Sequence, residues 1–132
     1  MAGAPSICPT LLYRDARAAI KLLTESFGFS QVAVHEGEDG SITHAELSYG
    51  NGVVMLGSSE TGSLFAQAMG AHRGAAGVYV VVEGVDEHYR RAVEHGVEIL
   101  MEPTDQDYGA RDYMARDPEG NIWSFGTYAP AP

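Results

Sequence analysis

Two titratable side chains, His44 and Glu46, stand two positions apart in a run of alternating polar and apolar residues. If this run is a β-strand, both side chains project from one face of the sheet, because successive strand side chains point to opposite faces. The pair has the right ligand types for zinc, nickel or iron, and Glu46 could instead act as a general base with His44 as its proton partner. The default interpretation is an ion pair or a solvated pair.

The remaining candidates for chemistry give weaker patterns. Cys8 is the single cysteine, so it forms neither an intramolecular disulfide nor a cysteine-rich zinc site by itself. A lone cysteine in a strand is usually a small buried apolar residue. His72, His88 and His95 fall in linker or helix-surface positions and are expected to be solvated. His35 ends a predicted strand, and nothing in the sequence selects it.

The composition limits the class of protein. A length of 132 residues with 45% hydrophobic and 20% charged residues predicts one globular domain. The sequence has neither an apolar run long enough for a membrane span nor a start typical of a signal peptide, so we expect a cytoplasmic protein. Because 18 acidic residues face 8 basic ones, the formal charge is −10, and we expect neither nucleic acid nor a membrane as a partner.

The pattern of apolar residues predicts a strand, a helix and three more strands in the first half of the chain. Asp15 is the expected N-cap of a helix over 15–27, and Gly28 supplies the left-handed residue that ends it. Gly50, Asn51 and Gly52 predict a tight hairpin. The expected strands are 6–13, 29–35, 42–49 and 53–58.

The same order returns in the second half, with strands expected at 78–82, 97–101, 111–116 and 122–128. A helix over 86–95 is followed by Gly96, and its expected inward residues are Val85, Tyr89, Ala92 and Val93. Gly28 and Gly96 lie 68 residues apart, and a fixed internal offset indicates a duplicated unit. We therefore expect a single domain over 1–132, made of modules 4–58 and 77–128. A glycine-rich linker with one short helix would join them.

Hairpin geometry assigns side chains to faces, because directly paired residues share a face. A two-residue turn at either Gly50-Asn51 or Asn51-Gly52 predicts an apolar, helix-covered face with Ala45, Leu47, Tyr49, Val54 and Leu56. The opposite face then carries His44, Glu46, Ser48, Val53 and Met55. A three-residue loop at 118–120 likewise predicts a covered face with Tyr113, Ala115, Trp123 and Phe125, opposite Asp112, Met114, Ser124 and Gly126. A loop count wrong by one would turn Trp123 outward as a stacking platform.

The stretch from Tyr108 to Phe125, together with the segments His44-Ala45-Glu46-Leu47 and Val53-Val54-Met55-Leu56, resembles the glyoxalase/bleomycin-resistance/dioxygenase (vicinal oxygen chelate) superfamily. The resemblance covers essentially the whole chain. It implies an α+β fold of two βαβββ repeats, whose curved mixed sheets surround a concave cleft. The family includes metal isomerases, dioxygenases, thiol transferases and metal-free drug-binding proteins, so the resemblance carries fold further than function.

The family's metalloenzymes place His, Glu or Gln ligands on the first and fourth strands of each repeat. Carrying those positions over gives Cys8, Met55, Val78 and Ser124. Valine has no donor atom, methionine offers only a soft thioether, and serine is a poor ligand for a divalent ion. The resemblance with this departure implies a protein without a bound metal or other cofactor.

The leading hypothesis is a metal-free binding protein that sequesters an aromatic, peptide-like or cationic natural product, as in antibiotic resistance. The residues expected to bind the ligand are Cys8, Thr10, His44, Glu46, Met55, Tyr108, Asp112, Met114 and Ser124. The resemblance also implies a homodimer, in which halves could be exchanged between chains. The alternative is a glyoxalase-like isomerase or lyase. It would use His44 and Glu46 as metal ligands, joined by Asp112, or Glu46 as a base. A third possibility is a role in assembly alone.

Overall fold

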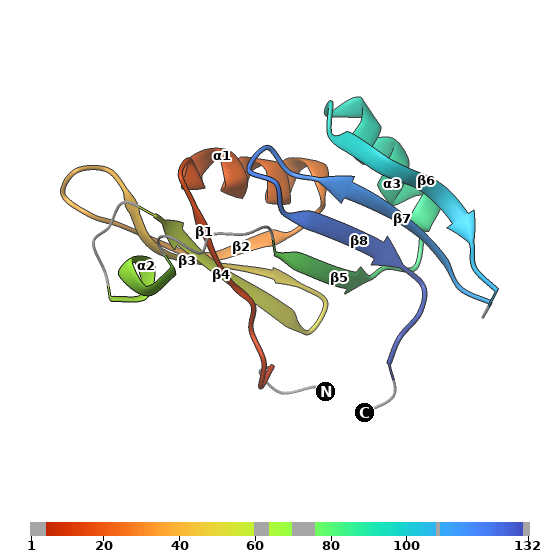
Figure 1. Ribbon diagram of the computed structural model, residues 1–132, viewed down its shortest axis with the longest axis horizontal. Coiled ribbons are helices and arrows are strands. Elements are labelled where there is room, and N and C mark those ends of the chain that lie inside the picture. The colour runs from red at the N-terminus through yellow and green to blue at the C-terminus, as the bar shows by residue number, and fades with distance from the viewer. Residues whose placement is uncertain (1–4, 60–63, 70–75, 108, 131–132) are drawn as a thin grey trace. The chain divides into compact units, whose positions relative to one another are not determined.

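The computed structural model describes residues 5–59, 64–69, 76–107 and 109–130. The chain divides into two compact units, residues 1–74 and 75–132, and each contains one four-stranded mixed sheet (Figure 1). In each unit, the elements of the repeat follow the chain order strand, helix, strand, strand, strand, which confirms the predicted α+β fold of two βαβββ repeats. The predicted bounds of the modules, and the cleft between the sheets, stay predictions.

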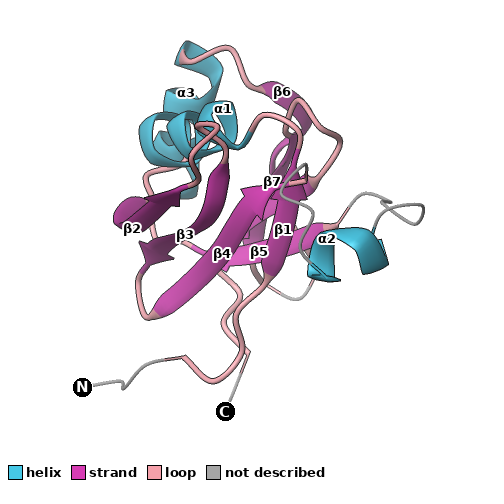
Figure 2. Cartoon of the chain, turned by 90° about the vertical axis from the view of Figure 1, so that its left-hand side faces the viewer, coloured by secondary structure: helices cyan, strands magenta, loops and turns pink. Residues whose placement is uncertain are grey.

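The first unit contains β1 (Thr10–Tyr13), α1 (Ala16–Lys21), a π-helical turn η1 (Leu22–Ser26), β2 (Ser30–Glu36), β3 (Ile42–Tyr49) and β4 (Gly52–Ser58). Its sheet has the strand order β1-β4-β3-β2, which Figure 2 shows. β1 is parallel to β4, whereas the other pairs are antiparallel. The short helix α2 (Leu64–Met69) follows the sheet, in the segment where the sequence predicts one.

Local signals set the ends of α1. The side chain of Asp15 accepts a hydrogen bond from the backbone N–H of Ala18 (3.0 Å), which confirms the predicted N-cap. The helical segment closes with a wide turn, in which the N–H of Phe27 donates to the carbonyl of Leu22 (3.2 Å). Gly28 follows with φ 83°, a value that favours glycine. The predicted helix 15–27 is therefore confirmed, with a π-helical final turn.

The hairpin of β3 and β4 has the predicted two-residue loop, since Tyr49 pairs with Gly52 and Leu47 with Val54. The predicted apolar face is confirmed because Ala45, Leu47 and Leu56 are almost fully buried. β1 is shorter than the predicted strand 6–13 and begins only at Thr10.

The second unit contains β5 (Gly77–Val81), α3 (Val85–Glu94), β6 (Glu98–Asp105), β7 (Arg111–Arg116) and β8 (Ile122–Gly126). The strand order is β5-β8-β7-β6, and β5 is parallel to β8 (Figure 1). α3 packs against β6 and β7 and ends before Gly96, whose φ is 78°. None of the helices in the described parts of the chain is long and apolar enough to cross a membrane.

The buried side of the second sheet confirms the predicted register. Tyr113 pairs with Phe125 and Ala115 with Trp123, and all four are fully buried. Trp123 is therefore a core residue and not an outward platform. Its indole N–H donates to the buried carboxylate of Asp117 (3.1 Å), so the one polar atom of the indole is satisfied inside the core.

Three predictions for the second unit are wrong in detail. β6 continues to Asp105 beyond the predicted end at Met101, whereas β8 ends at Gly126 before the predicted Tyr128. Val93 was predicted to point inward, but it is 46% exposed. Residues three or four positions apart share a helix face, so the buried face of α3 contains Val85, position 88 or 89, and Ala92. Val93 lies at the edge of this face.

Candidate functional site

We call the side of each sheet opposite its buried residues the open face. On the first sheet, strand register aligns Thr10 of β1, Met55 of β4, Glu46 of β3 and Ala33 of β2 in one row across the open face. Cys8 lies just before β1 and is half-buried. The N–H of Met55 donates to the carbonyl of Pro9 (2.8 Å), which ties this segment to β4. This row thus brings three of the predicted binding residues together, Thr10, Glu46 and Met55, with Cys8 beside them.

His44 completes the polar part of this face. Its Nε2 lies 2.9 Å from Oε2 of Glu46, and the two side chains are 41% and 37% exposed. The ring of His35, on β2, stacks on that of His44 with centroids 6.1 Å apart. Sequence reasoning gave His35 no role, although strand pairing with His44 would have brought it here. Water competes for the charges of such an exposed pair, so the contact contributes little stability.

On the second sheet, the open face of β5 carries a different residue than the sequence predicted. β5 is parallel to β8, and the register pairs Val78 with Trp123 and Tyr79 with Ser124. Val78 therefore points to the buried side, and the prediction that placed it at the ligand position is wrong. Tyr79 occupies the open face instead. The run Val78-Tyr79-Val80-Val81-Val82 is almost continuously apolar, so it contains no alternation that could have assigned its faces.

The open face of the second sheet carries the other predicted binding residues. Ser124 pairs with Met114, and Met114 with Met101 of β6, so these three extend the row that begins at Tyr79. Asp112 lies on the same face and accepts a hydrogen bond from Nε2 of Gln106 (2.8 Å). Tyr108, predicted to lie over the ligand, is outside the described residues.

The far side of β7 is fixed to α3 by charge. The guanidinium of Arg111 contacts the carboxylates of Asp86 (2.9 Å) and Asp105 (3.1 Å), and these two bonds raise the pKa of Arg111. All three groups are at the surface, so their role is orientation more than stability. The contacts position the strand that carries Asp112 and Met114.

His88 was predicted to be solvated, and that prediction is wrong. Its Nδ1 shares a hydrogen bond with the hydroxyl of buried Tyr113, and its ring lies 4.3 Å from that of Phe125. The signal for this inward orientation was present, since His88 follows Val85 by three residues and precedes Ala92 by four. His95, in contrast, is exposed as predicted, and His72 lies outside the described residues.

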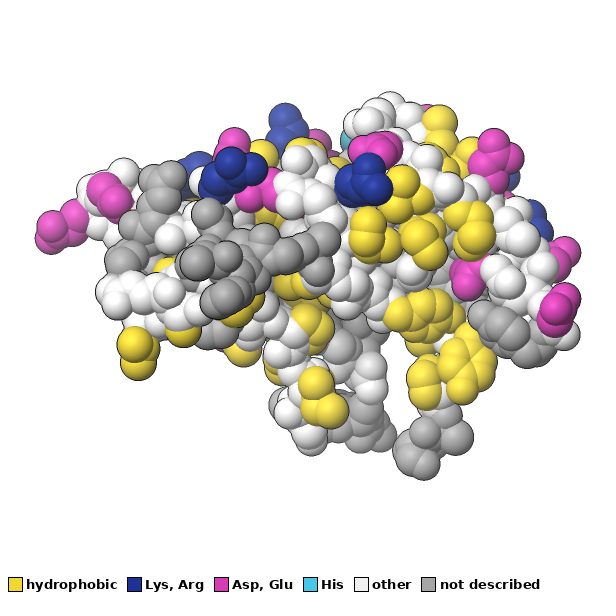
Figure 3. Space-filling view, viewed as in Figure 1, with side chains coloured by type: hydrophobic (Ala, Val, Ile, Leu, Met, Phe, Trp, Pro, Cys, Tyr) yellow, Lys and Arg dark blue, Asp and Glu magenta, His cyan; other side chains and the backbone are white. Residues whose placement is uncertain are grey.

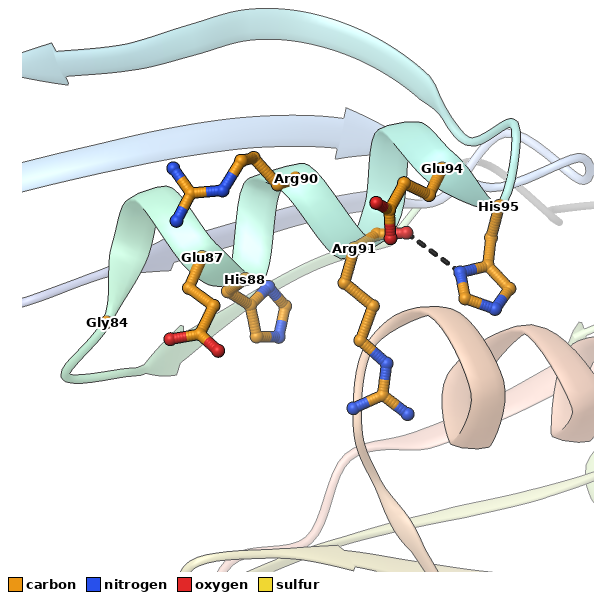
Figure 4. Close-up of a pocket in the computed structure, with 7 residues that line it drawn as sticks. All are labelled: Gly84, Glu87, His88, Arg90, Arg91, Glu94 and His95. Atoms are coloured by element: carbon orange, nitrogen blue, oxygen red, sulfur yellow. Dashed lines mark hydrogen bonds between the residues drawn. The ribbon is translucent and has the colours of Figure 1, made fainter.

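Three cavities lie within the described parts of single units, and none is lined by the predicted binding residues. The largest, about 650 Å³, runs along α3 (Figure 4). Figure 4 shows Glu87, His88 and Arg91 projecting from one side of the helix, with the ring of His95 bonded to the carbonyl of Arg91 (2.8 Å). Apart from Gly84, its lining residues are charged or histidine, so the cavity lacks the mostly apolar walls typical of a site for an organic ligand.

The described residues do not assemble an evident metal centre. No three His, Cys, Asp or Glu side chains among them are grouped so that they could hold an ion. Tyr79 pairs with Ser124 as Thr10 pairs with Met55, so the residue of β5 that corresponds to Cys8 is Gly77. A thiol, a thioether, a glycine without a side chain and an alcohol do not match the imidazole and carboxylate donors preferred by zinc, nickel or iron. These residues do not fit the metal that the family's enzymes hold.

The chain matches a protein-family model over most of its length and is similar to curated proteins. Residues 8–125 match the model of the "Glyoxalase/Bleomycin resistance protein/Dioxygenase superfamily". The uncharacterized protein Mb0911c of Mycobacterium bovis is 28% identical over 126 residues, which cover 92% of this chain and 82% of that protein.

Two solved structures illustrate the likeness in three dimensions. TioX from Micromonospora sp. ML1 is 31% identical and superposes with a TM-score of 0.82 over 96% of this chain and all of TioX. A glyoxalase I mutant from Zea mays is 21% identical, with a TM-score of 0.71 over 93% of this chain and 44% of the maize chain. At that identity, the likeness to the maize protein shows the fold alone.

Proposed function

The chain belongs to the Glyoxalase/Bleomycin resistance protein/Dioxygenase superfamily, and from this premise we propose that it binds a small organic molecule without a metal. The ligand would lie against the open face of a sheet and leave chemically unchanged. An aromatic, peptide-like or cationic natural product suits such a face, and sequestration of such a compound would confer resistance to it. The proposal includes that the protein is a homodimer and acts in the cytoplasm.

The observation that carries this proposal is the chemistry at the positions where the family's metalloenzymes hold their ion. On the first sheet these positions are Cys8 and Met55, and on the second they are Gly77 and Ser124, with Tyr79 beside Ser124 on the same open face. Polarising a substrate oxygen requires a cation or preorganised donors, and these side chains supply neither. A thioether and an aromatic ring instead give adaptable apolar contact with an organic ligand.

The surroundings support binding more than catalysis. Met114 and Met101 extend the apolar part of the second open face, while His44 and Glu46 give the first face a polar anchor. A binding site of this kind needs mostly apolar walls with a few directed polar groups. The family's own description includes a resistance protein, which is consistent with capture of a toxic compound.

The test is a search for bound and for altered compounds. Purified protein is incubated with a panel of aromatic and peptide-like natural products, and native mass spectrometry identifies those retained. We expect one or more compounds to bind at stoichiometric amounts and to be recovered unchanged. Recovery of an altered product at more than one equivalent per protein would establish turnover and contradict the proposal.

A second candidate function rests on the 2.9 Å contact between His44 and Glu46. In a glyoxalase-like isomerase or lyase, this pair would ligate a metal or Glu46 would take a proton from carbon. Elemental analysis of the purified protein separates the two functions. Stoichiometric zinc, nickel or iron, with an activity that chelation removes and Glu46→Gln abolishes, would favour the enzyme.

Light scattering during size-exclusion chromatography tests the proposed dimer, and a monomeric mass would contradict it.

A further inference from the structure

One corner of the second open face is built around a glycine. Gly126 of β8 pairs with Asp112 of β7, and both lie on the face that carries Ser124 and Met114. A Cβ atom on Gly126 would lie 2.7 Å from the hydroxyl oxygen of Tyr79 and 3.2 Å from its Cε1. The ring edge of Tyr79 therefore occupies the space that any other residue at position 126 would fill with its side chain.

The phenol ring is held in this place from two sides. Tyr79 leans from β5 across β8, and its hydroxyl donates a hydrogen bond to the carbonyl of Tyr128 (2.8 Å). With its hydroxyl fixed and its edge over Gly126, the ring has little rotational freedom left to lose when a ligand binds. Tyr79 nevertheless stays 40% exposed, so part of the ring remains available for contact.

Asp112 brings a negative charge to the same corner. The Cβ of Asp112 also lies 2.7 Å from the position that a Cβ on Gly126 would take. The Tyr79 hydroxyl lies at the same distance from that position, so Tyr79 and Asp112 are close neighbours at this corner. Its one hydrogen bond from a side chain within the described residues comes from the neutral amide of Gln106. The two arginines of β7 are committed elsewhere, Arg111 to Asp86 and Asp105 and Arg116 to Glu98.

We propose that Tyr79, Asp112 and Gly126 form a subsite for a planar aromatic cation on the open face of the second sheet. The inference rests on the proposed function and adds to it the chemical class of the group recognised in the second unit. The electron-rich face of a phenol attracts a cation, and a carboxylate beside it adds a charge partner. Val81 and Tyr128 are also exposed in this unit, by 43% and 50%. Figure 3 shows hydrophobic side chains gathered on the surface of this unit. The net charge of −10 favours the approach of a cation.

Two dyes of the same shape test this subsite. N-methylacridinium carries a fixed positive charge, and acridine at slightly alkaline pH is its neutral counterpart. Fluorescence titration of the full chain gives the affinity for each dye. Tyr79→Leu removes the ring, Tyr79→Phe keeps the ring and removes its anchor, and Asp112→Asn removes the charge with little change in shape. Glu87→Gln, which removes a negative charge from α3, is the charge-matched control.

The two dyes are expected to respond differently to the loss of charge at Asp112. Y79L should weaken binding of the cation by about tenfold, through loss of stacking and of the cation–π attraction, while Y79F stays within about threefold of the unaltered protein. D112N should weaken the cation by about fivefold and leave acridine within about twofold. E87Q should change neither affinity beyond about twofold.

Several results would overturn the subsite. These are equal loss of both dyes in D112N, unchanged binding in Y79L, a loss in E87Q as large as in D112N, or no saturable binding of either dye to the unaltered protein. The proposed function is judged separately, by the panel of natural products. If the panel yields a ligand while the affinity for both dyes is unchanged in the Tyr79 and Asp112 variants, the subsite is wrong and the binding function stands.

Discussion

The two units use the same strand pairing but fill it with different residues. Register matches Ala45 and Leu56 of the first sheet with Tyr113 and Phe125 of the second. It likewise matches Leu47 and Val54 with Ala115 and Trp123. The first buried face is therefore aliphatic and the second is aromatic, although all eight residues are buried. Where Trp123 is large, the residue opposite it is alanine, so the backbone can keep its spacing while the side chains change.

The open faces differ as much as the buried ones. His44 and Glu46 of the first sheet correspond to Asp112 and Met114 of the second, each pair 68 positions apart. Thr10 corresponds to Tyr79, because each pairs with the matching residue of its neighbouring strand. A duplicated fold thus offers one polar, histidine-bearing face and one aromatic, acidic face. The two open faces therefore differ in chemistry although they share one fold, and the function of one does not follow from that of the other.

The two buried faces differ most in the size of their central residue, and truncation should expose this difference. Trp123→Ala should lower the free energy of unfolding by about 4 kcal/mol, because it opens a large cavity and removes the donor to Asp117. Val54→Ala, at the corresponding position, should cost about 2 kcal/mol. Urea unfolding followed by circular dichroism measures both. Equal losses would show that the aromatic core adds nothing beyond the aliphatic one.

Two turns with the same backbone hydrogen bonds differ in how their aspartate is used. In 37–41 and in 117–121, the first N–H donates to the fifth carbonyl, and the fourth N–H to the first carbonyl. Asp39 is at the surface, where bonds from the Ser41 hydroxyl and N–H lower the pKa of Asp39. Asp117 is buried and accepts from Trp123 and Asn121.

Removing each aspartate should therefore have unequal effects. Asp117→Ala leaves buried donors without an acceptor and should cost about 3 kcal/mol in the free energy of unfolding. Asp39→Ala is the control at the exposed turn and should have a much smaller effect. The emission of Trp123 reports the unfolding of the second unit directly. A similar midpoint in urea for both variants would contradict the role assigned to Asp117.

Ligand binding should depend on the apolar side chains of the open faces. Met114→Ala and Met55→Ala should each weaken a ligand found in the panel by about 1–3 kcal/mol, through lost apolar contact. Isothermal titration calorimetry measures the change. Val93→Ala removes apolar volume from the exposed edge of α3 and is the matched control. Unchanged affinity in both methionine variants would place the ligand somewhere other than the open faces.

The smallest effect is expected for the pair on the first open face. A double-mutant cycle with His44→Ala and Glu46→Ala should give a coupling of about 0.2–1 kcal/mol in unfolding free energy, because both side chains are well exposed. Added salt should reduce the coupling. For a ligand, Glu46→Gln should matter mainly when the ligand is cationic. A coupling several times larger, insensitive to salt, would mean that the pair is sequestered from water.

Much of the fold was predictable because its signals are local. Asp15 and Gly28 mark the ends of the first helix, and the two-residue loop after Tyr49 fixes the register of β3 and β4. Once a register is known, the strict alternation of strand side chains assigns faces without further information. The same argument placed Trp123 correctly in the core. The candidate residues of β3, β4, β7 and β8 were therefore found on the faces predicted for them.

What the sequence did not determine depends on contacts between segments far apart in the chain. A parallel pair has no hairpin to set its register, so only the tertiary structure decided that Tyr79, and not Val78, shares a face with Ser124. The burial of Asp117 likewise depends on its hydrogen bonds with Trp123 and Asn121, which form only in the folded unit. The space that Gly126 leaves for the ring of Tyr79 exists only once β5 and β8 lie side by side. Local propensity cannot encode such pairings, because the free energy that selects them arises only when distant side chains meet.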